Sequence, residues 1–174
     1  MKERIAAVGP EVALVGPFPP PYGGVSVHIQ RLFFRLKSEG IPVTLHTPAT
    51  NDETDAAKLR DGAIVVRRAW WGRKYFQYWG HSWLVHHAWR CTGRVIHCHE
   101  LFDLAPHIWM ICAIGKRAVV TVHDQLIGQR WDRARLLEQI SAQRLLKSSC
   151  VRWIAVSSVI KEQLVEVKEV AGLG

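Results

Sequence analysis

The stretch VALVGPFPPPYGGVSVHIQRLFFRLKSEG, residues 12–40, contains an apolar run, a proline-rich turn, two adjacent glycines and a helical pattern. The apolar run at residues 12–16 is typical of a buried strand. The apolar residues that follow the glycines have the spacing of one helical face; they are Val25, Ile29, Leu32, Phe33 and Leu36. Gly40 is placed to end that helix. The stretch therefore predicts a strand, a tight loop and a helix, which is how a βαβ unit begins.

The rest of the chain repeats this alternation of strands and helices. Further strands are expected at residues 41–47, 63–68, 94–100, 118–124 and 152–158, and helices at 103–115, 133–149 and 159–170. The polar residues 48–61 are expected to form a loop. The alternation predicts an α/β fold with a doubly wound parallel sheet and helices on both faces. Ligands bind such sheets beyond the carboxyl ends of the strands, so the loop 17–24 and the tips HCHE, VHDQ and VSS should share one edge.

Composition limits the class of protein and its partners. The chain has 174 residues, of which 48% are hydrophobic and 22% are charged, as in an ordinary single globular domain. Its net charge of +8 favours partners with negative charge, such as phosphates, nucleotides, anionic lipids or nucleic acid. The four cysteines, Cys91, Cys98, Cys112 and Cys150, contain no C-x-x-C pair and lie in or near apolar runs. We expect them to be reduced and buried in a cytoplasmic protein.

Gly23 and Gly24 stand where the first helix is predicted to start. A helix N-terminus carries unpaired N–H groups and a partial positive charge, and glycine lets an anion reach the backbone, so the pair indicates a phosphate site. The alternative is a turn that requires a positive φ. No G-x-G-x-x-G occurs, the second strand ends LHTP without an acid, and no Gly-Lys-Ser/Thr follows the loop. The ligand is therefore expected to be neither NAD nor an ATP held by a P-loop.

Histidines end two of the predicted strands, in VIHCHE and VTVHDQ. His97 and His99 point the same way along a strand, so they could bind a metal if further ligands joined them. The candidates for those ligands are Glu100, Asp124 and His123. Adjacent strand tips also converge on polar substrates without a metal, and we expect no metal here. For His123 the alternative is a core histidine bonded to a carbonyl, but its place at a strand's carboxyl end favours a functional role.

Residues 62–99 contain no Asp or Glu and combine cations with aromatic rings. The densest part holds Arg67, Arg68, Trp70, Trp71, Arg73 and Lys74. Such a mixture suits an anionic membrane surface, where rings sit among headgroups and cations meet phosphates. It also suits a helix that buries its aromatics and leaves its cations in water. A nucleic-acid partner is not expected, because no module signature for nucleic-acid binding accompanies the charge.

Ordered features along nearly the whole chain resemble the N-terminal domain of retaining glycosyltransferases of family 4, the group 1 enzymes of the GT-B fold. They are FPPPYGG after the first strand, SEGIPVTLHT entering the second, VIHCHE at the fourth, VVTVHD at the fifth and IAVSSVIKEQL at the sixth. The resemblance implies one of two Rossmann-like domains that face each other across a cleft. The N-terminal domain mainly binds the acceptor, and the C-terminal domain mainly binds a UDP- or GDP-linked sugar.

The resemblance also implies roles for individual residues. Gly23 and Gly24 would approach the donor diphosphate and sugar, and His123 would sit beside the transferred sugar as the catalytic residue. The acceptor side would be lined by Tyr22, His99, Glu100, Asp124, Gln125 and Ser157; Ser157 is equally suited to capping the last helix. The implied chemistry is front-face substitution with retention, which needs no cofactor, no metal and no protein nucleophile.

One feature of the family is missing from the sequence. The basic pair that binds the diphosphate and the E-x7-E motif belong to the family's C-terminal domain, and nothing in these 174 residues supplies it. The expectation is a single acceptor-binding domain, either excised or half of a split enzyme, that transfers no sugar by itself. The alternative is a non-catalytic module of the same fold that docks to a membrane or a partner. The expected location is cytoplasmic, with peripheral attachment to a membrane.

Overall fold

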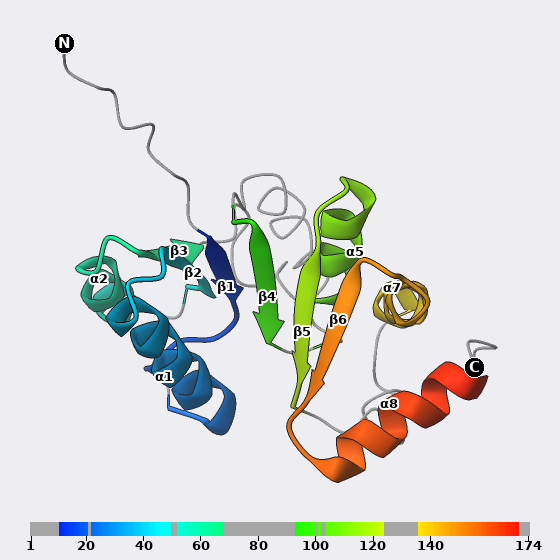
Figure 1. The fold of residues 1–174 in the computed structure, drawn as a ribbon. Helices are drawn as coiled ribbons and strands as arrows, with labels where there is room; N and C mark the ends of the chain where they lie inside the picture. The colour runs from blue at the N-terminus through cyan, green and yellow to red at the C-terminus, as the bar shows by residue number, and fades with distance from the viewer. Residues whose placement is uncertain are drawn as a thin grey trace.

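The structure is a computed structural model that describes residues 11–20, 22–49, 52–67, 93–99, 101, 104–123 and 136–170. Within these ranges a sheet of six parallel strands forms the centre of the molecule (Figure 1). The strands are β1 (Val12–Val15), β2 (Val43–Pro48), β3 (Ile64–Arg67), β4 (Val95–His99), β5 (Ala118–Val122) and β6 (Val151–Ala155). Their order across the sheet is β3-β2-β1-β4-β5-β6. This is the Rossmann-like doubly wound order, so the predicted fold class is confirmed.

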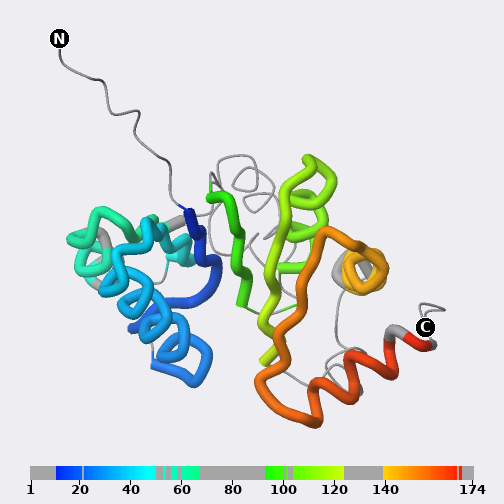
Figure 2. The backbone as a smooth tube through the Cα atoms, in the orientation of Figure 1, coloured from blue at the N-terminus to red at the C-terminus, as the bar shows by residue number. Residues whose placement is uncertain are grey.

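Helices connect the strands and cover the sheet. They are α1 (Gly24–Ser38), α2 (Asp52–Leu59), α5 (Ala105–Ala113), α7 (Leu136–Leu146) and α8 (Ser158–Val170). Figure 2 traces the path from β1 through α1 to β2 and, on the other half of the sheet, from β4 through α5 to β5. No helix in the described ranges is both long enough and apolar enough to cross a bilayer.

The helix α2 corrects the prediction of a loop at residues 48–61. That prediction weighed the polar composition of the segment and overlooked the topology. Because β2 and β3 run parallel, a crossover must carry the chain back along the sheet, and a helix is the usual form of that crossover. Its last residues, Ala56, Ala57, Lys58 and Leu59, are also good helix formers.

Each face of the sheet has its own apolar core, because successive residues of a strand point to opposite faces. Along β1, Leu14 packs with Ile29 and Phe33 of α1, whereas Ala13 and Val15 belong to the core that includes residues of α5, α7 and α8. The apolar face predicted for the first helix is therefore confirmed: Ile29 and Phe33 are buried, and the other three residues pack against the same cluster.

Backbone caps explain where α1 begins and ends. Ser26 caps the start of the helix. The Gly23 N–H donates to the Ser26 Oγ atom at 2.8 Å, and the Ser26 hydroxyl donates to the Gly23 carbonyl at 3.0 Å. At the other end Gly40 has a φ of 73°, and its N–H donates to the Lys37 carbonyl while the Ile41 N–H donates to the Leu36 carbonyl. This pair of bonds is the Schellman motif, which confirms Gly40 as the end of the helix.

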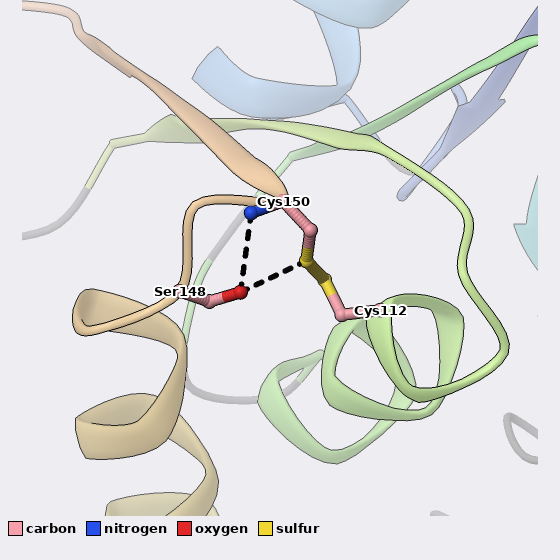
Figure 3. Close-up of a disulfide and its surroundings, with 3 residues drawn as sticks. All are labelled: Cys112, Ser148 and Cys150. Carbon is pink, nitrogen blue, oxygen red and sulfur yellow. Dashed lines mark hydrogen bonds between the residues drawn. A yellow bond between two sulfur atoms is a disulfide. The ribbon is translucent and has the colours of Figure 1, made fainter.

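Two of the four cysteines form a disulfide, which corrects the prediction that all of them are reduced. Cys112, near the end of α5, is bonded to Cys150, which directly precedes β6 (Figure 3). Ser148 supports the bridge, because its hydroxyl lies 3.0 Å from the Cys150 Sγ and accepts the Cys150 N–H at 3.2 Å. Cys98 is buried and is not part of the disulfide, as predicted, and Cys91 lies outside the described residues. The prediction failed because residues far apart in the sequence carry no local sign of pairing. The cysteines therefore no longer favour a cytoplasmic location.

Gly93 leads to a prediction about stability. It is buried just before β4, and a Cβ added there would lie 2.8 Å from the backbone nitrogen of Ala13 and 3.0 Å from the carbonyl oxygen of Val95. Backbone atoms cannot move aside without distorting the β1–β4 pairing. Gly93→Ala is therefore expected to lower the free energy of unfolding by about 3 kcal/mol in urea titrations. Gly62→Ala is the control: no described atom lies within 4 Å of its added Cβ, so its stability should stay at or slightly above wild type.

Candidate active site

The candidate site lies at the carboxyl edge of the sheet, where the strand order changes direction between β1 and β4. The crossovers from β1 and from β4 leave in opposite directions at this point, and ligands of doubly wound sheets bind beside it. In Figure 1 the strands β4, β5 and β6 point toward the side of the molecule on which α1 and α8 begin. The prediction that these strand tips share one edge is confirmed for the described residues, because β1, β4, β5 and β6 are parallel neighbours.

The start of α1 lies at this edge, and the space around its two glycines is open. Gly23 is the N-cap with an extended φ of −156°, and Gly24 is the first helical residue. Among the described glycines only Gly16, Gly40 and Gly115 have a positive φ, so the alternative of a turn that needs one does not apply to Gly23 or Gly24. No described atom lies within 4 Å of a Cβ added to Gly24, and at Gly23 the nearest is the Ser26 hydroxyl at 3.8 Å. Neither backbone conformation nor packing therefore explains the glycines.

Three histidines from three elements meet beside this helix start. His99 ends β4 and is fully buried, His123 follows β5 and is half-buried, and His28 is exposed in the second turn of α1. The Nδ1 atom of His99 lies 3.2 Å from the Nε2 atom of His123. The ring centroid of His28 lies 5.3 Å from that of His99 and 5.3 Å from that of His123. The ligating nitrogens of all three lie within 4.8 Å of one another. We call these three residues the histidine cluster.

Gly16, directly after β1, allows α1 and β4 to approach each other here. A Cβ at this position would lie 2.6 Å from the Cδ1 atom of Ile29 and 3.2 Å from the Cβ atom of His99. Any side chain would push one of the two elements away. The closeness of α1 to His99 thus depends on a residue without a side chain at the end of β1.

His97 lies behind the cluster on the same face of β4. Its ring stacks on that of His99 with 4.3 Å between centroids, as expected for residues two apart in a strand. Its Nε2 atom is 2.7 Å from the Oγ1 atom of Thr121 on β5, so this nitrogen is already bonded. Since the pair is held together by the sheet, His97 acts as a support for His99.

Burial decides the protonation of this pair. Burial, reinforced by the nearby rings of His28 and His123, lowers the pKa of His97 to about 4. Burial also lowers the pKa of His99 to about 2, with His97, His123 and His28 opposing its charge in that order. Both imidazoles are therefore neutral near pH 7. Each presents one N–H donor and one nitrogen lone pair.

The other predicted site residues are placed only in part. Tyr22 is exposed beside Gly23, so it is available to a ligand. Ser157 accepts the Ile160 N–H at 3.3 Å, which confirms it as the cap of α8. Arg67 ends β3. The remaining predicted residues lie outside the described ranges: Glu100, Asp124, Gln125, Arg68, Trp70, Trp71, Arg73 and Lys74.

His28 is the member of the cluster that the sequence reading missed. A signal was present, because His28 follows Gly24 by four residues and so lies one turn along the same side of α1. The apolar spacing of that helix indicates only which face is buried. It does not indicate which polar side chains near the N-terminus of the helix lie opposite the strand tips.

The arrangement can bind a polar, anionic molecule. Amide groups of the first turn of α1 point out of the helix end, and the helix has no acidic residue in that turn to repel an anion. Neutral imidazoles at the same edge can donate to and accept from hydroxyl groups. The site thus combines an anion-binding helix end with hydroxyl-binding rings.

Comparison with known proteins agrees with this chemistry. A family model described as Glycosyltransferase Family 4 matches residues 22–172, which covers the helix start, the histidine cluster and all strands from β2 to β6. The comparison with curated proteins finds no relative that matches the chain. Since the family model covers most of its length, the chain belongs to glycosyltransferase family 4.

Proposed function

We propose that this chain is the acceptor-binding half of a retaining, group 1 glycosyltransferase of the GT-B fold. The enzyme would move a sugar from a UDP- or GDP-linked donor to a lipid-linked, polysaccharide or small acceptor. The observation that carries the proposal is the start of α1: two glycines, required neither by φ nor by packing, stand beside the histidine cluster at the switch point of the sheet. The approach of an anionic ligand accounts for them.

Each part of the site has a role in this proposal. The first turn of α1 would receive the donor diphosphate, whose charge the helix N-terminus stabilises as the bond to the sugar breaks. His123 would hold a hydroxyl of the transferred sugar, and His99 would fix the orientation of His123 through the 3.2 Å contact between their ring nitrogens. The acceptor hydroxyl would attack from the face that the diphosphate leaves. Positioning would then provide most of the rate enhancement, without a metal cofactor.

The nucleotide itself would be held by a second Rossmann-like domain, in the same or in a separate polypeptide. The resemblance assigns the basic pair and the E-x7-E motif to that domain, and the one E-x7-E spacing in this sequence, Glu3 to Glu11, precedes the first strand and so lies in the wrong place. We therefore expect no sugar transfer by this chain alone with any nucleotide-sugar. Sustained turnover by the purified chain would contradict this assignment of halves. The predicted contact of residues 62–99 with an anionic membrane, and the cytoplasmic location, stay predictions.

A substitution at Gly24 tests the diphosphate site. Gly24→Val should fold normally, because Gly24 lies in helical conformation and no described atom is near its added Cβ. Its branched side chain should cover the first N–H groups of α1 and weaken the binding of UDP-glucose and GDP-mannose at least tenfold, measured by ligand-detected NMR. That loss corresponds to about 1.4 kcal/mol.

Gly62→Val is the matched control for this experiment. Gly62 is an exposed glycine with open space around it, and it precedes β3 at the opposite edge of the sheet. Its substitution should leave nucleotide-sugar binding unchanged. If Gly24→Val binds as well as wild type, the helix start is not the diphosphate site.

A further inference from the structure

The histidine cluster has a property that sugar binding does not use. We propose that His28, His99 and His123 form a binding site for one divalent transition-metal ion of the class of Zn²⁺, Co²⁺, Ni²⁺ and Cu²⁺. The inference stands on the positions of three imidazole rings and does not depend on the proposed transferase activity.

Geometry is the first argument for the site. A tetrahedral ion with bonds of about 2.0–2.1 Å to histidine nitrogens holds those nitrogens about 3.3 Å apart. The Nδ1 atom of His99 and the Nε2 atom of His123 already lie 3.2 Å apart. The third ring, His28, has its ligating nitrogen within 4.8 Å of both. A side-chain movement of about 1.5 Å would bring it to the nitrogen–nitrogen separation that a tetrahedral ion requires. His28 is exposed and so can rotate.

The rigid framework around two of the ligands is the second argument. His99 ends β4 and His123 directly follows β5, and these two strands are paired in the sheet. Stacking on His97, whose Nε2 atom contacts Thr121, holds the ring of His99 in place. The third ligand comes from a helix that Gly16 allows to lie against β4. Two ligands, His99 and His123, are therefore already in position, and the third, His28, would rotate toward the metal when it binds.

The donor set selects the class of ion. Imidazole nitrogens suit Zn²⁺, Cu²⁺, Ni²⁺ and Co²⁺, whereas Mg²⁺ and Ca²⁺ require oxygen ligands, and the cluster itself contains none. Histidine must be neutral to bind a metal. Three protein ligands leave a fourth position for water or an anion.

Occupation of the site has a consequence for the proposed function. The metal would take the Nε2 atom of His123 and so replace its contact with the Nδ1 atom of His99, which orients His123 toward the sugar in the proposed mechanism. The ion and the donor sugar should therefore compete, so that the site acts as an inhibitory one. This consequence, unlike the metal site itself, rests on the proposed function.

Cobalt is the probe that tests the site directly. The full chain, freed of metal with a chelator, is titrated with Co²⁺ and followed by visible absorption. The expected result is one Co²⁺ per chain with the strong d–d bands of a four-coordinate ion, displaced by stoichiometric Zn²⁺. His28→Gln should weaken Co²⁺ binding at least tenfold and abolish the bands. Since His28 is exposed, this variant should keep the wild-type circular dichroism spectrum.

Two further variants separate the cluster from other histidines. His28→Asp replaces one metal ligand by another and should retain Co²⁺ binding. The adjacent pair His86 and His87 could bind metal adventitiously, so the double variant His86→Gln/His87→Gln should bind Co²⁺ as wild type does. The proposal is overturned if wild type gives no d–d bands, or if His28→Gln binds Co²⁺ as tightly as wild type.

A competition experiment distinguishes failure of the metal site from failure of the proposed function. UDP-glucose or GDP-mannose, whichever binds, is titrated with and without saturating Zn²⁺. Weaker sugar binding in the presence of Zn²⁺ supports both assignments. If Zn²⁺ binds through the cluster but leaves sugar binding unchanged, the metal site stands and the sugar contact of His123 is wrong.

Discussion

Lowering the pH from 7 to about 4.5 is expected to reduce the free energy of unfolding by about 5 kcal/mol, measured in urea with a chelator present. The cause is the buried pair on β4, in which burial lowers the pKa of His97 to about 4 and that of His99 to about 2. Domains of this size are stable by roughly 5–15 kcal/mol, so the loss should remove about a third or more of the free energy of unfolding.

The sign of this effect follows from proton binding. Below the ordinary histidine pKa of 6.5 the unfolded chain binds a proton at each of the two rings, while the folded protein does not. Acid therefore favours the unfolded state, and the slope is about 1.4 kcal/mol per pH unit for each ring. The groups that face the pair are the rings of His28 and His123, which oppose its charge. The hydrogen bond from Lys37 lowers the pKa of Asp61 below its usual 3.8, so protonation of Asp61 reduces the free energy of unfolding only at lower pH.

His97→Gln separates this cause from general acid denaturation. Glutamine keeps a hydrogen-bonding group near Thr121 but has no proton to gain. The slope of stability against pH between 6 and about 4.5 should fall by roughly half, from about 2.7 to about 1.4 kcal/mol per unit. An unchanged slope in this variant would show that other groups cause the acid sensitivity.

Loss of the Cys112–Cys150 disulfide is expected to cost about 4 kcal/mol. The bridge links residues 38 positions apart. Closing a loop of that length lowers the conformational entropy of the unfolded chain, which stabilises the folded protein by about this amount. The bridge ties the end of α5 to the residue before β6 and so joins two consecutive crossovers on one face of the sheet (Figure 3).

Reductant and two substitutions test this cost. Dithiothreitol should lower the urea midpoint of wild type, and Cys112→Ser should have that lower midpoint with or without reductant. Cys98→Ala is the control, because Cys98 is a buried thiol of β4 outside the disulfide, and its loss should leave the response to reductant unchanged. A wild-type midpoint that does not respond to reductant would contradict the prediction.

Much of the fold could be predicted because its signals are local. The strand at residues 12–16 and the helix after Gly24 follow from a short apolar run and from a helical spacing of apolar residues, both confirmed in β1 and α1. The helix α2 was missed because its polar composition carries no apolar face, although the parallel pairing of β2 and β3 requires a crossover there.

The candidate site could be predicted only in its parts. Gly23 and Gly24, at the start of α1, and the histidines of β4 and β5 are each visible as residues at the end of an element. Their meeting is not visible, because it depends on β1 pairing with β4 in the centre of the sheet. His28 and His99 come from elements far apart in the chain, and Gly16 lets them approach by having no side chain.

The sequence by itself therefore determined the alternation of strands and helices, the edge of the sheet that the strand tips share and the family of the protein. These properties follow from backbone periodicity and from turn residues, which act within a few positions of the chain. Only the tertiary structure decided that Cys112 pairs with Cys150 and that His28 joins His99 and His123. The pairing order of the strands and the packing of α1 on the sheet create those contacts, and no local pattern encodes them.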